Sequence, residues 1–341
     1  LFGRPIRWIL FLHGTQVVPF EIQRGAQATS EQVKPVVAGA VTYGHRFFSK
    51  SGRAGRPIRV RSFADYKRAL AANYVVLGRE ARRARITRKL EACAARVGGR
   101  VALETDQSAL LNEVPDLVEY PSVVTGTFPE EFLKLPAEVL KTTMIHHQHY
   151  FPVANRRGRL KPHFLAVTNT PRDNVARIAR NAERVLVARL RDAKFFWDAD
   201  RRGRLEDRLE RLDTLLFHQK LGSYREKAER TSALAGRIAS EVLGADETTT
   251  EAVRRAGLLS KADLATEMVG EFPELQGVMG GVYAREQGEP ETVWKAIYHH
   301  YQPVGIEADA PPANRELGAA GVAWAAVSLA DKLDTLVGLF H

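Results

Sequence analysis

The residues that could bind a metal ion or carry a proton are few and lie far apart in this sequence. Asp331 is the first acid of "LADKLDTL", which is otherwise mostly apolar. Much earlier, Ser260 and Lys261 follow two leucines in "GLLSKAD". Carboxylates and imidazoles bind divalent cations, whereas an ammonium group is repelled by them. The two segments therefore form either a metal site or a site whose ligands have been replaced.

A working site of the HD metal hydrolase type needs a first His, a His-Asp dyad and a distant Asp, which together hold divalent cations. Such sites read "H-x-x-R", "LLHD" and "ADxLD". Here Gly222 stands three residues before Arg225 in place of the first His, and Ser260 and Lys261 replace the dyad. The pattern predicts a degenerate HD site without metal, in which the Lys261 ammonium takes roughly the metal's place and pairs with Asp331. The alternative is an Asp331 that faces solvent.

Three histidines, His146, His147 and His149, lie together in "HHQHY" and suggest a second metal site. Ligands at positions i, i+1 and i+3 do not converge well from a helix or from a strand. No Asp, Glu or Cys at ligand spacing accompanies them. We therefore expect ordinary core or surface histidines, with a metal site as the alternative.

The net charge of +10 is unevenly distributed along the 341 residues. Residues 1–100 hold 20 Lys and Arg against 5 Asp and Glu, whereas the remaining 241 residues hold 30 against 35. A basic region of this kind is typical of proteins that bind a polyanion. An Arg-rich solvated surface without a partner is the alternative.

The densest basic segment is "REARRARITRKL", which falls in a helical register without proline before Gly98 and Gly99. Its cations could contact phosphate oxygens along an RNA backbone, and a solvated helix surface is the alternative. The candidate RNA-binding residues are Arg79, Arg82, Arg83, Arg85, Arg88 and Lys89.

Other chemistries lack their usual sequence signals. Neither a Walker-type loop nor a dinucleotide-binding glycine pattern is present, and no nucleophile motif stands out. The single cysteine, Cys93, excludes an internal disulfide and fits a reducing, cytoplasmic location. No apolar run approaches the ~20 residues of a membrane span, and no signal peptide opens the sequence.

The elements that must position these residues change in type along the chain. Residues 4–22 predict a β-hairpin around His13-Gly14-Thr15, and residues 63–97 predict one or two helices. Residues 107–170 mix helix and strand, with a helix broken at Pro115 and a turn at 155–160. From about residue 183 the pattern is helical to the end. The predicted fold class is α+β.

Several long blocks together resemble the β subunit of the bacterial heterotetrameric glycyl-tRNA synthetase, occur in that family's order and cover nearly the whole chain. The blocks are "RPIRWILFLHG", "GHRF", "LLNEVPDLVEYPSVVTGTFPEEFLKLPAEVL", "QHYFPV", "NAERVLVARLRDAKFFW", "LEDRLERLDTLLFHQKLGS", "AGLLSKADLATEMVGEFPELQGVMG" and "LADKLDTLVGLF".

The resemblance implies a cytoplasmic α2β2 enzyme that joins glycine to tRNA(Gly) with ATP and Mg²⁺. In that family the catalytic core lies on the α subunit, so this chain is expected to hold no catalytic residue and to bind no cofactor itself. Its expected partners are the α subunit and tRNA. The basic first hundred residues agree with an RNA partner.

The resemblance also implies a mosaic: a mixed α/β region like the B3/4 editing domain, then an all-helical domain like an HD domain. The expected divisions are residues 1–50 as part of the subunit core, 51–210 as the B3/4-like domain with the basic helix, and 211–341 as the degenerate HD-like domain. We expect a fragment that lacks an N-terminal stretch and the C-terminal anticodon-binding domain.

Two alternatives to a tRNA-binding ligase subunit remain at this point. One is an HD-type metal phosphohydrolase or an enzyme that edits mischarged tRNA. The other is a basic scaffold module without an RNA role, which would require the basic face of residues 79–89 to pack against protein.

Overall fold

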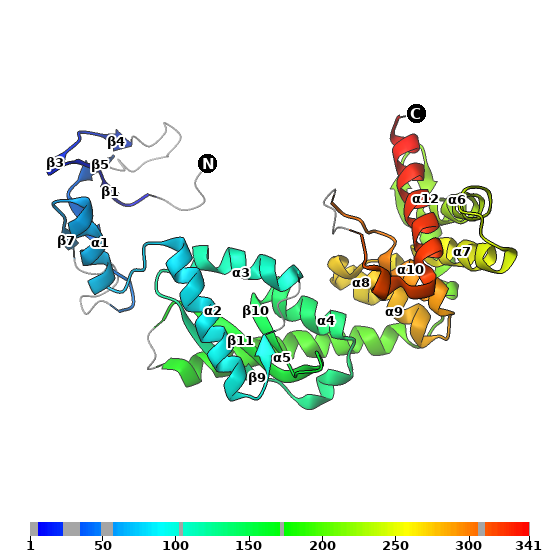
Figure 1. The fold of residues 1–341 in the computed structure, drawn as a ribbon, viewed down its shortest axis with the longest axis horizontal. Helices are drawn as coiled ribbons and strands as arrows, with labels where there is room; N and C mark the ends of the chain where they lie inside the picture. Colours follow the sequence, from blue (N-terminus) through cyan, green and yellow to red (C-terminus); the bar gives the residue numbers. More distant parts are fainter. Residues whose placement is uncertain are drawn as a thin grey trace. The chain divides into compact units, whose positions relative to one another are not determined.

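A computed structural model describes residues 6–22, 35–48, 57–101, 105–170, 174–305 and 311–340. The chain forms two compact units (Figure 1). The first contains Leu1–Glu130 and Met144–Val187, and the second contains Glu131–Thr143 and Ala188–His341. Small sheets lie in the first unit and most helices in the second, so the α+β prediction is confirmed. The domain boundary predicted at residue 50 lies outside the described residues.

The first unit begins with short strands and one helix. Its elements are β1 (Ile9–Leu10), β2 (Leu12–His13), β3 (Gln16–Val17), β4 (Glu21–Ile22), β5 (Val36–Gly39), β6 (Val41–Tyr43), β7 (Pro57–Arg59) and α1 (Phe63–Ala72). Strands β2 and β3 form the predicted hairpin, with Gly14 at a φ of 61° in its turn. Strand β5 lies between β1 and β4, and β6 pairs with β7.

A four-stranded antiparallel sheet forms the centre of the first unit, in the order β8-β10-β11-β9. Its strands are β8 (Arg100–Val101), β9 (Ser122–Thr127), β10 (Tyr150–Ala154) and β11 (Leu160–Thr168). The predicted turn joins β10 to β11, where the Asn155 N–H donates to the Arg159 carbonyl at 2.8 Å. Gly126 is required opposite Phe164, because an added Cβ would lie 2.2 Å from that ring.

Two helices supply apolar residues to the core on one side of this sheet. They are α2 (Arg79–Arg96) and α3 (Thr105–Leu117), and their buried residues, including Ile86, Leu90 and Leu111, pack with Phe151 and Leu165 of the strands. The prediction that Pro115 breaks α3 is wrong, because the helix continues to Leu117. Pro115 lies in the last turn, where few further helical hydrogen bonds remain to be disrupted.

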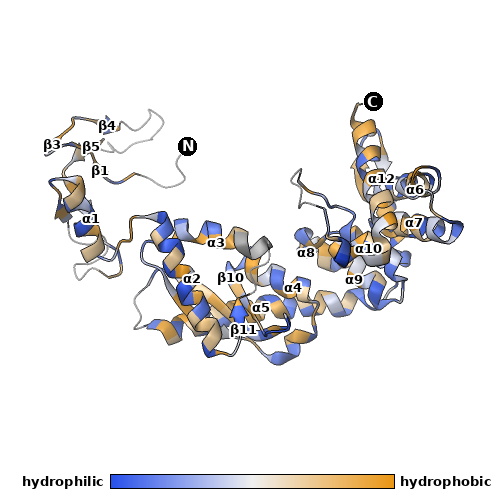
Figure 2. Ribbon diagram, viewed as in Figure 1, coloured by the Kyte–Doolittle hydropathy of each residue, from blue (hydrophilic) through white to orange (hydrophobic). Residues whose placement is uncertain are grey.

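The second unit is largely helical. Its α-helices are α4 (Ala137–Thr142), the second half of α5 (Val175–Asp200), α6 (Tyr224–Arg237), α7 (Glu247–Leu259), α8 (Glu267–Glu271), α9 (Val278–Glu286), α10 (Glu291–His299), α11 (Asn314–Leu317) and α12 (Gly321–Phe340). Helix α12 packs against α6, α7 and α10 and is predominantly hydrophobic (Figure 2).

The expectation of an uninterrupted helical region needs two corrections. Helix α5 begins at Val175, ahead of the predicted start near residue 183. Strands β12 (Leu216–His218) and β13 (Gly222–Ser223) also form a small antiparallel pair before α6. Within the described ranges, no helix has both the length and the hydropathy needed to cross a bilayer.

Candidate functional site

The C-terminal end of α7 directs Lys261 into the interior of the second unit. Helix α7 ends at Leu259, and the Ser260 hydroxyl then donates to the Gly257 carbonyl at 2.8 Å. Gly257 lets α7 pack closely on α6, because an added Cβ would lie 2.8 Å from the Ser232 Cα. Ser260 and Lys261 are consequently both buried.

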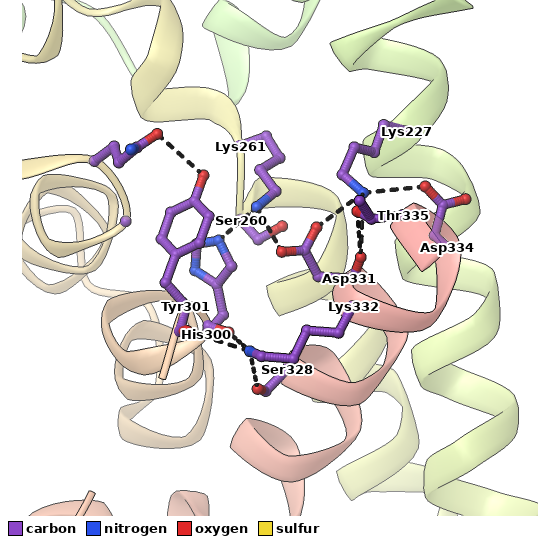
Figure 3. A network of polar contacts seen from close by, with 12 residues as sticks. Lys227, Ser260, Lys261, His300, Tyr301, Ser328, Asp331, Lys332, Asp334 and Thr335 are labelled. Atoms are coloured by element: carbon purple, nitrogen blue, oxygen red, sulfur yellow. Dashed lines mark hydrogen bonds and ion pairs between the residues drawn. The ribbon is translucent and has the colours of Figure 1, made fainter. Parts of the chain in front are cut away.

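The Lys261 ammonium has three partners in this interior (Figure 3). Its Nζ lies 2.9 Å from Asp331 Oδ2 on α12 and 2.9 Å from His300 Nε2, just after α10. It also lies 3.9 Å from the centre of the Tyr301 ring, which is a cation–π contact. The predicted pairing of Lys261 with Asp331 is therefore confirmed, and the alternative of a solvent-facing Asp331 is wrong.

His300 acts as an uncharged acceptor for this ammonium. Its Nδ1 lies 2.6 Å from the Ile297 carbonyl, so Nδ1 carries the proton and Nε2 offers its lone pair to Lys261. Burial and the nearby Lys261 lower the pKa of His300 to about 3. Burial likewise lowers the pKa of Lys261 to about 8, although Asp331 opposes this change. Both side chains thus keep these protonation states at neutral pH.

Asp331 is held by a second cation from α6. Lys227 Nζ lies 3.1 Å from Asp331 Oδ1, outside hydrogen-bond geometry, and donates to Asp334 Oδ2 at 3.1 Å and to the Thr335 hydroxyl at 2.7 Å. Arg230 donates to Asp334 Oδ1 at 2.6 Å. Burial alone would raise the pKa of Asp331, but the Lys261 and Lys227 ammonium groups outweigh it and hold that pKa below its ordinary value.

A further buried carboxylate, Asp263, caps the start of α9. Its Oδ2 accepts from the backbone N–H groups of Gly277 at 2.5 Å and Gly280 at 2.9 Å. Carboxylates at a helix N-terminus are favoured by the free N–H groups and by the helix dipole. Burial nevertheless dominates and raises the pKa of Asp263 to about 6.

The structure brings two of the four residues predicted for the degenerate HD site into contact, Lys261 and Asp331. Ser260 is buried with its hydroxyl on the Gly257 carbonyl, whereas Gly222 lies in β13 and forms part of a helix cap. Gly222 has a φ of 83°, and an added Cβ would lie 1.7 Å from the Glu226 carboxylate. That carboxylate closes a capping box with Ser223 at the start of α6. Gly222 therefore serves this cap.

Sequence reasoning missed Lys227 and His300. Lys227 and Arg230 are spaced i, i+3 in "YREKAER", which indicates a shared helix face, but nothing in the string indicates that the face is buried. His300 follows His299 in "YHHYQP", which has no recognisable motif.

Of the three clustered histidines, His149 has an acidic partner. His149 has a φ of 55° and lies 3.2 Å from Glu113 Oε1 through its Nε2. Across the described residues, no three His, Cys, Asp or Glu side chains gather in a way that could hold a metal ion.

The basic face of α2 has two different roles along its length. Arg82 donates to the Pro115 carbonyl at 2.7 Å and to the carbonyls of Val76 and Leu77, so much of its hydrogen-bonding capacity is used within the chain. Arg85 donates to the Pro121 carbonyl at 3.0 Å and lies 4.0 Å from the centre of the Tyr120 ring.

Arg79 also binds the end of α3, through the Asn112 carbonyl and the Asp116 carboxylate. Cations are favoured at such carbonyl-rich helix ends. In contrast, Arg88 is exposed. Arg83 makes a long ion pair, 4.0 Å, with the exposed carboxylate of Glu80. The RNA contacts of this helix stay a prediction, and Arg79, Arg82 and Arg85 hold partners within the chain.

Comparison with known proteins gives one consistent result. A family model described as "Glycyl-tRNA synthetase beta subunit" matches residues 1–341. The chain is 41% identical over 339 residues to the glycine–tRNA ligase beta subunit of Syntrophus aciditrophicus (strain SB), covering 99% of this chain and 45% of that protein. For the beta subunit of Phenylobacterium zucineum (strain HLK1) the identity is 45% over 339 residues, with 99% and 47% covered. For that of Bacillus subtilis (strain 168) it is 39% over 337 residues, with 99% and 45% covered. The chain therefore spans about half the length of the curated relatives it matches.

Proposed function

Because this chain belongs to the family of glycyl-tRNA synthetase beta subunits, we propose that it is the tRNA-binding part of a glycine–tRNA ligase. In this proposal it supports the ATP-dependent attachment of glycine to tRNA(Gly) by an α subunit. The observation that carries the proposal is the family match, which extends over residues 1–341 without interruption.

The proposal divides the reaction between two subunits. ATP and Mg²⁺ are used on the α subunit, and this chain contributes RNA contacts and no catalytic residue. The excess of cations in its first hundred residues supports an RNA partner, since each phosphate contact releases condensed counterions. The intact enzyme is proposed to be a cytoplasmic α2β2 heterotetramer.

We further propose that residues 51–210 form a B3/4-like domain and residues 211–341 a degenerate HD-like domain. The four-stranded sheet with α2 and α3 supports the first assignment, and the helices around Asp331 support the second. The 2.9 Å contact between Lys261 and Asp331 supports a site in which an ammonium group has replaced the metal of an HD site. Asp331 would then be the one ligand position that is retained.

The alternative of a metal phosphohydrolase or an editing hydrolase is less favoured by the site. A divalent cation beside Asp331 would have to displace the buried Lys261 ammonium or tolerate its repulsion. The basic-scaffold alternative explains Arg82 and Arg85, which bind protein groups, but it gives no role to the exposed Arg88.

Reconstitution of the ligase tests the proposal. Glycyl-tRNA formation should require both the α subunit and the full-length protein that carries this chain, and tRNA should bind that protein with an affinity that falls steeply with salt. Equal aminoacylation by the α subunit alone would show that the chain has another role.

A further inference from the structure

The segment Gly44–Phe48 is fixed at both ends to the rest of the first unit. The His45 ring is fully buried, and its Nε2 lies 2.7 Å from Asn169 Oδ1. The His45 backbone N–H donates to the Asn73 carbonyl at 2.9 Å. Gly44 is needed for this approach, because an added Cβ would lie 2.5 Å from the Asn73 Cβ. The backbone here is therefore held in one position.

The same anchor extends to two further segments. Asn169 Oδ1 also accepts from the backbone N–H groups of Glu119 at 3.1 Å and Tyr120 at 3.0 Å. Phe48 stacks on Tyr74, with ring centres 4.7 Å apart, and packs edge-on against Tyr120 at 5.2 Å. Tyr74 adopts a φ of 61°, which is unfavourable for a residue with a side chain and is maintained only by its surroundings.

Between these anchors, Arg46 and Phe47 project outward. Phe47 is 56% exposed, and the Arg46 guanidinium lies 5.5 Å from the centre of its ring. Within the described part of the chain, no carboxylate forms an ion pair with Arg46. The Phe47 N–H donates to His45 Nδ1 at 3.1 Å. This hydrogen bond ties the backbone of the exposed Phe47 to the ring of the buried histidine.

The surroundings of this pair are basic. Residues 6–22, 35–48 and 57–77 hold six Lys or Arg residues and two acids, Glu21 and Asp65, and Glu119 adds an exposed carboxylate 3.8 Å from His45 Nε2. An aromatic face beside an unpaired guanidinium, on a positively charged surface, is the combination that binds unpaired nucleotides. The base stacks on the ring and the guanidinium binds the phosphate. A fixed backbone lowers the ordering cost of such a contact.

We propose that Arg46 and Phe47 contact an unpaired nucleotide of the tRNA, an inference that rests on the proposed function of the chain. Phe47 stacks on the base without reading its sequence, and Arg46 binds the adjoining phosphate. The buried His45 and its hydrogen bond to Asn169 position both side chains before the RNA arrives.

Binding of tRNA to the full-length protein assembled with the α subunit tests this pair. Base–aromatic stacking predicts that Phe47→Ala and Phe47→Leu each weaken binding about 5- to 150-fold, whereas Phe47→Trp retains it. The leucine variant preserves apolar area and removes only the aromatic face. The slope of log affinity against log salt should be unchanged in the Phe47 variants and shallower by about one in Arg46→Gln.

Phe63 supplies a matched control on α1. It is 67% exposed, and Lys67 Nζ lies 4.9 Å from its ring centre, but it has no buried anchor comparable to His45. Phe63→Leu should bind tRNA like the wild type. An equal loss in Phe63→Leu and Phe47→Leu would indicate a general effect of exposed aromatics and would overturn the assignment to Phe47.

A photocrosslinking phenylalanine analogue at position 47 gives a readout that does not depend on the stability of the variants. Crosslinks to an unpaired nucleotide would support the proposal. Crosslinks to the α subunit, or wild-type affinity in Phe47→Leu, would overturn it. Failure of the wild-type assembly to bind tRNA at all would instead refute the proposed function, so the two failures are distinguishable.

Discussion

At the scale of single residues, Asp331 is the centre of charge in the second unit. It has two ammonium partners, Lys261 and Lys227, whereas each lysine has other polar partners as well. Removing Asp331 therefore leaves more uncompensated charge than removing Lys261. This asymmetry makes the network testable by a double-mutant cycle.

Asp331→Leu should reduce the free energy of unfolding by about 3–5 kcal/mol, because it leaves the buried Lys261 ammonium without its carboxylate partner. Lys261→Met should cost less, since Asp331 keeps Lys227. The double variant should recover part of the loss seen in Asp331→Leu. Urea unfolding measures all three, and strictly additive losses would contradict the network. Arg237→Ala, which removes an exposed pair with Glu241, should stay near the wild-type value.

His300 predicts a specific pH dependence. Its pKa is about 3 in the folded chain and near 6.5 when unfolded, so the unfolded state binds more protons between these values. Stability is therefore lost as pH falls below about 6.5. Lys261, Asp331 and Lys332 face the ring or lie close to it and are retained in a His300→Gln variant.

The unfolding free energy of the wild type minus that of His300→Gln should fall by up to about 1.4 kcal/mol for each pH unit below 6.5. Asp263, whose raised pKa acts in the opposite direction, is present in both proteins and cancels. A difference that does not vary between pH 7 and pH 4.5 would show that folding leaves the pKa of His300 unchanged and would contradict this prediction.

At the scale of elements, the end of α3 and the residues that follow it supply partners to Arg79, Arg82 and Arg85 of α2. Arg82→Ala and Arg85→Ala should each destabilise the first unit by about 1–3 kcal/mol, because charged hydrogen bonds to carbonyls are lost. Arg83→Ala and Arg88→Ala should leave the melting temperature unchanged and make the salt dependence of tRNA binding shallower by about one per phosphate contact. If Arg82→Ala and Arg85→Ala instead made the salt dependence shallower without lowering stability, Arg82 and Arg85 would be the RNA contacts.

The junction between β13 and α6 makes a second prediction at this scale. Gly222→Ala should destabilise the chain by at least about 1–2 kcal/mol, because it meets both the positive φ and the Glu226 carboxylate. Gly244→Ala, at a φ of 65° with nothing within 4 Å of the added Cβ, isolates the cost of the backbone alone. Thermal unfolding measures the loss of stability caused by each variant. In a Glu226→Ala background, the loss caused by Gly222→Ala should approach the loss caused by Gly244→Ala, because the carboxylate is no longer present.

These elements also show what the sequence could predict. Helix α2 could be predicted from the helical spacing of its own residues. The β10–β11 turn could be predicted because it contains Gly158, which adopts a positive φ of 80°. The partners of Arg82 could not be predicted, since Pro115 lies 33 residues away and is brought there by core packing. Lys261 and Asp331 could be predicted because each lies in a short sequence motif. His300 lies in no motif and is 39 residues from Lys261, so only the folded chain shows that the two are in contact.

At the scale of the whole molecule, the proposed function assigns glycine activation to the α subunit. The purified chain alone should show no glycine-dependent exchange of pyrophosphate into ATP, because the proposed function assigns the catalytic core to the α subunit. Addition of the α subunit to the full-length protein should restore exchange and provides the positive control. Exchange by this chain in the absence of the α subunit would contradict the proposed division between the subunits.

The cation that neutralises Asp331 is a side chain of the same polypeptide. Its local concentration is therefore set when the chain folds and does not depend on the composition of the surrounding fluid. An ion held by mass action is lost on dilution or to a competing chelator, and its binding energy varies with supply. The charge of the buried Asp331 should therefore stay balanced during metal starvation, and Lys261 loses its own charge only by substitution or as the pH rises above about 8.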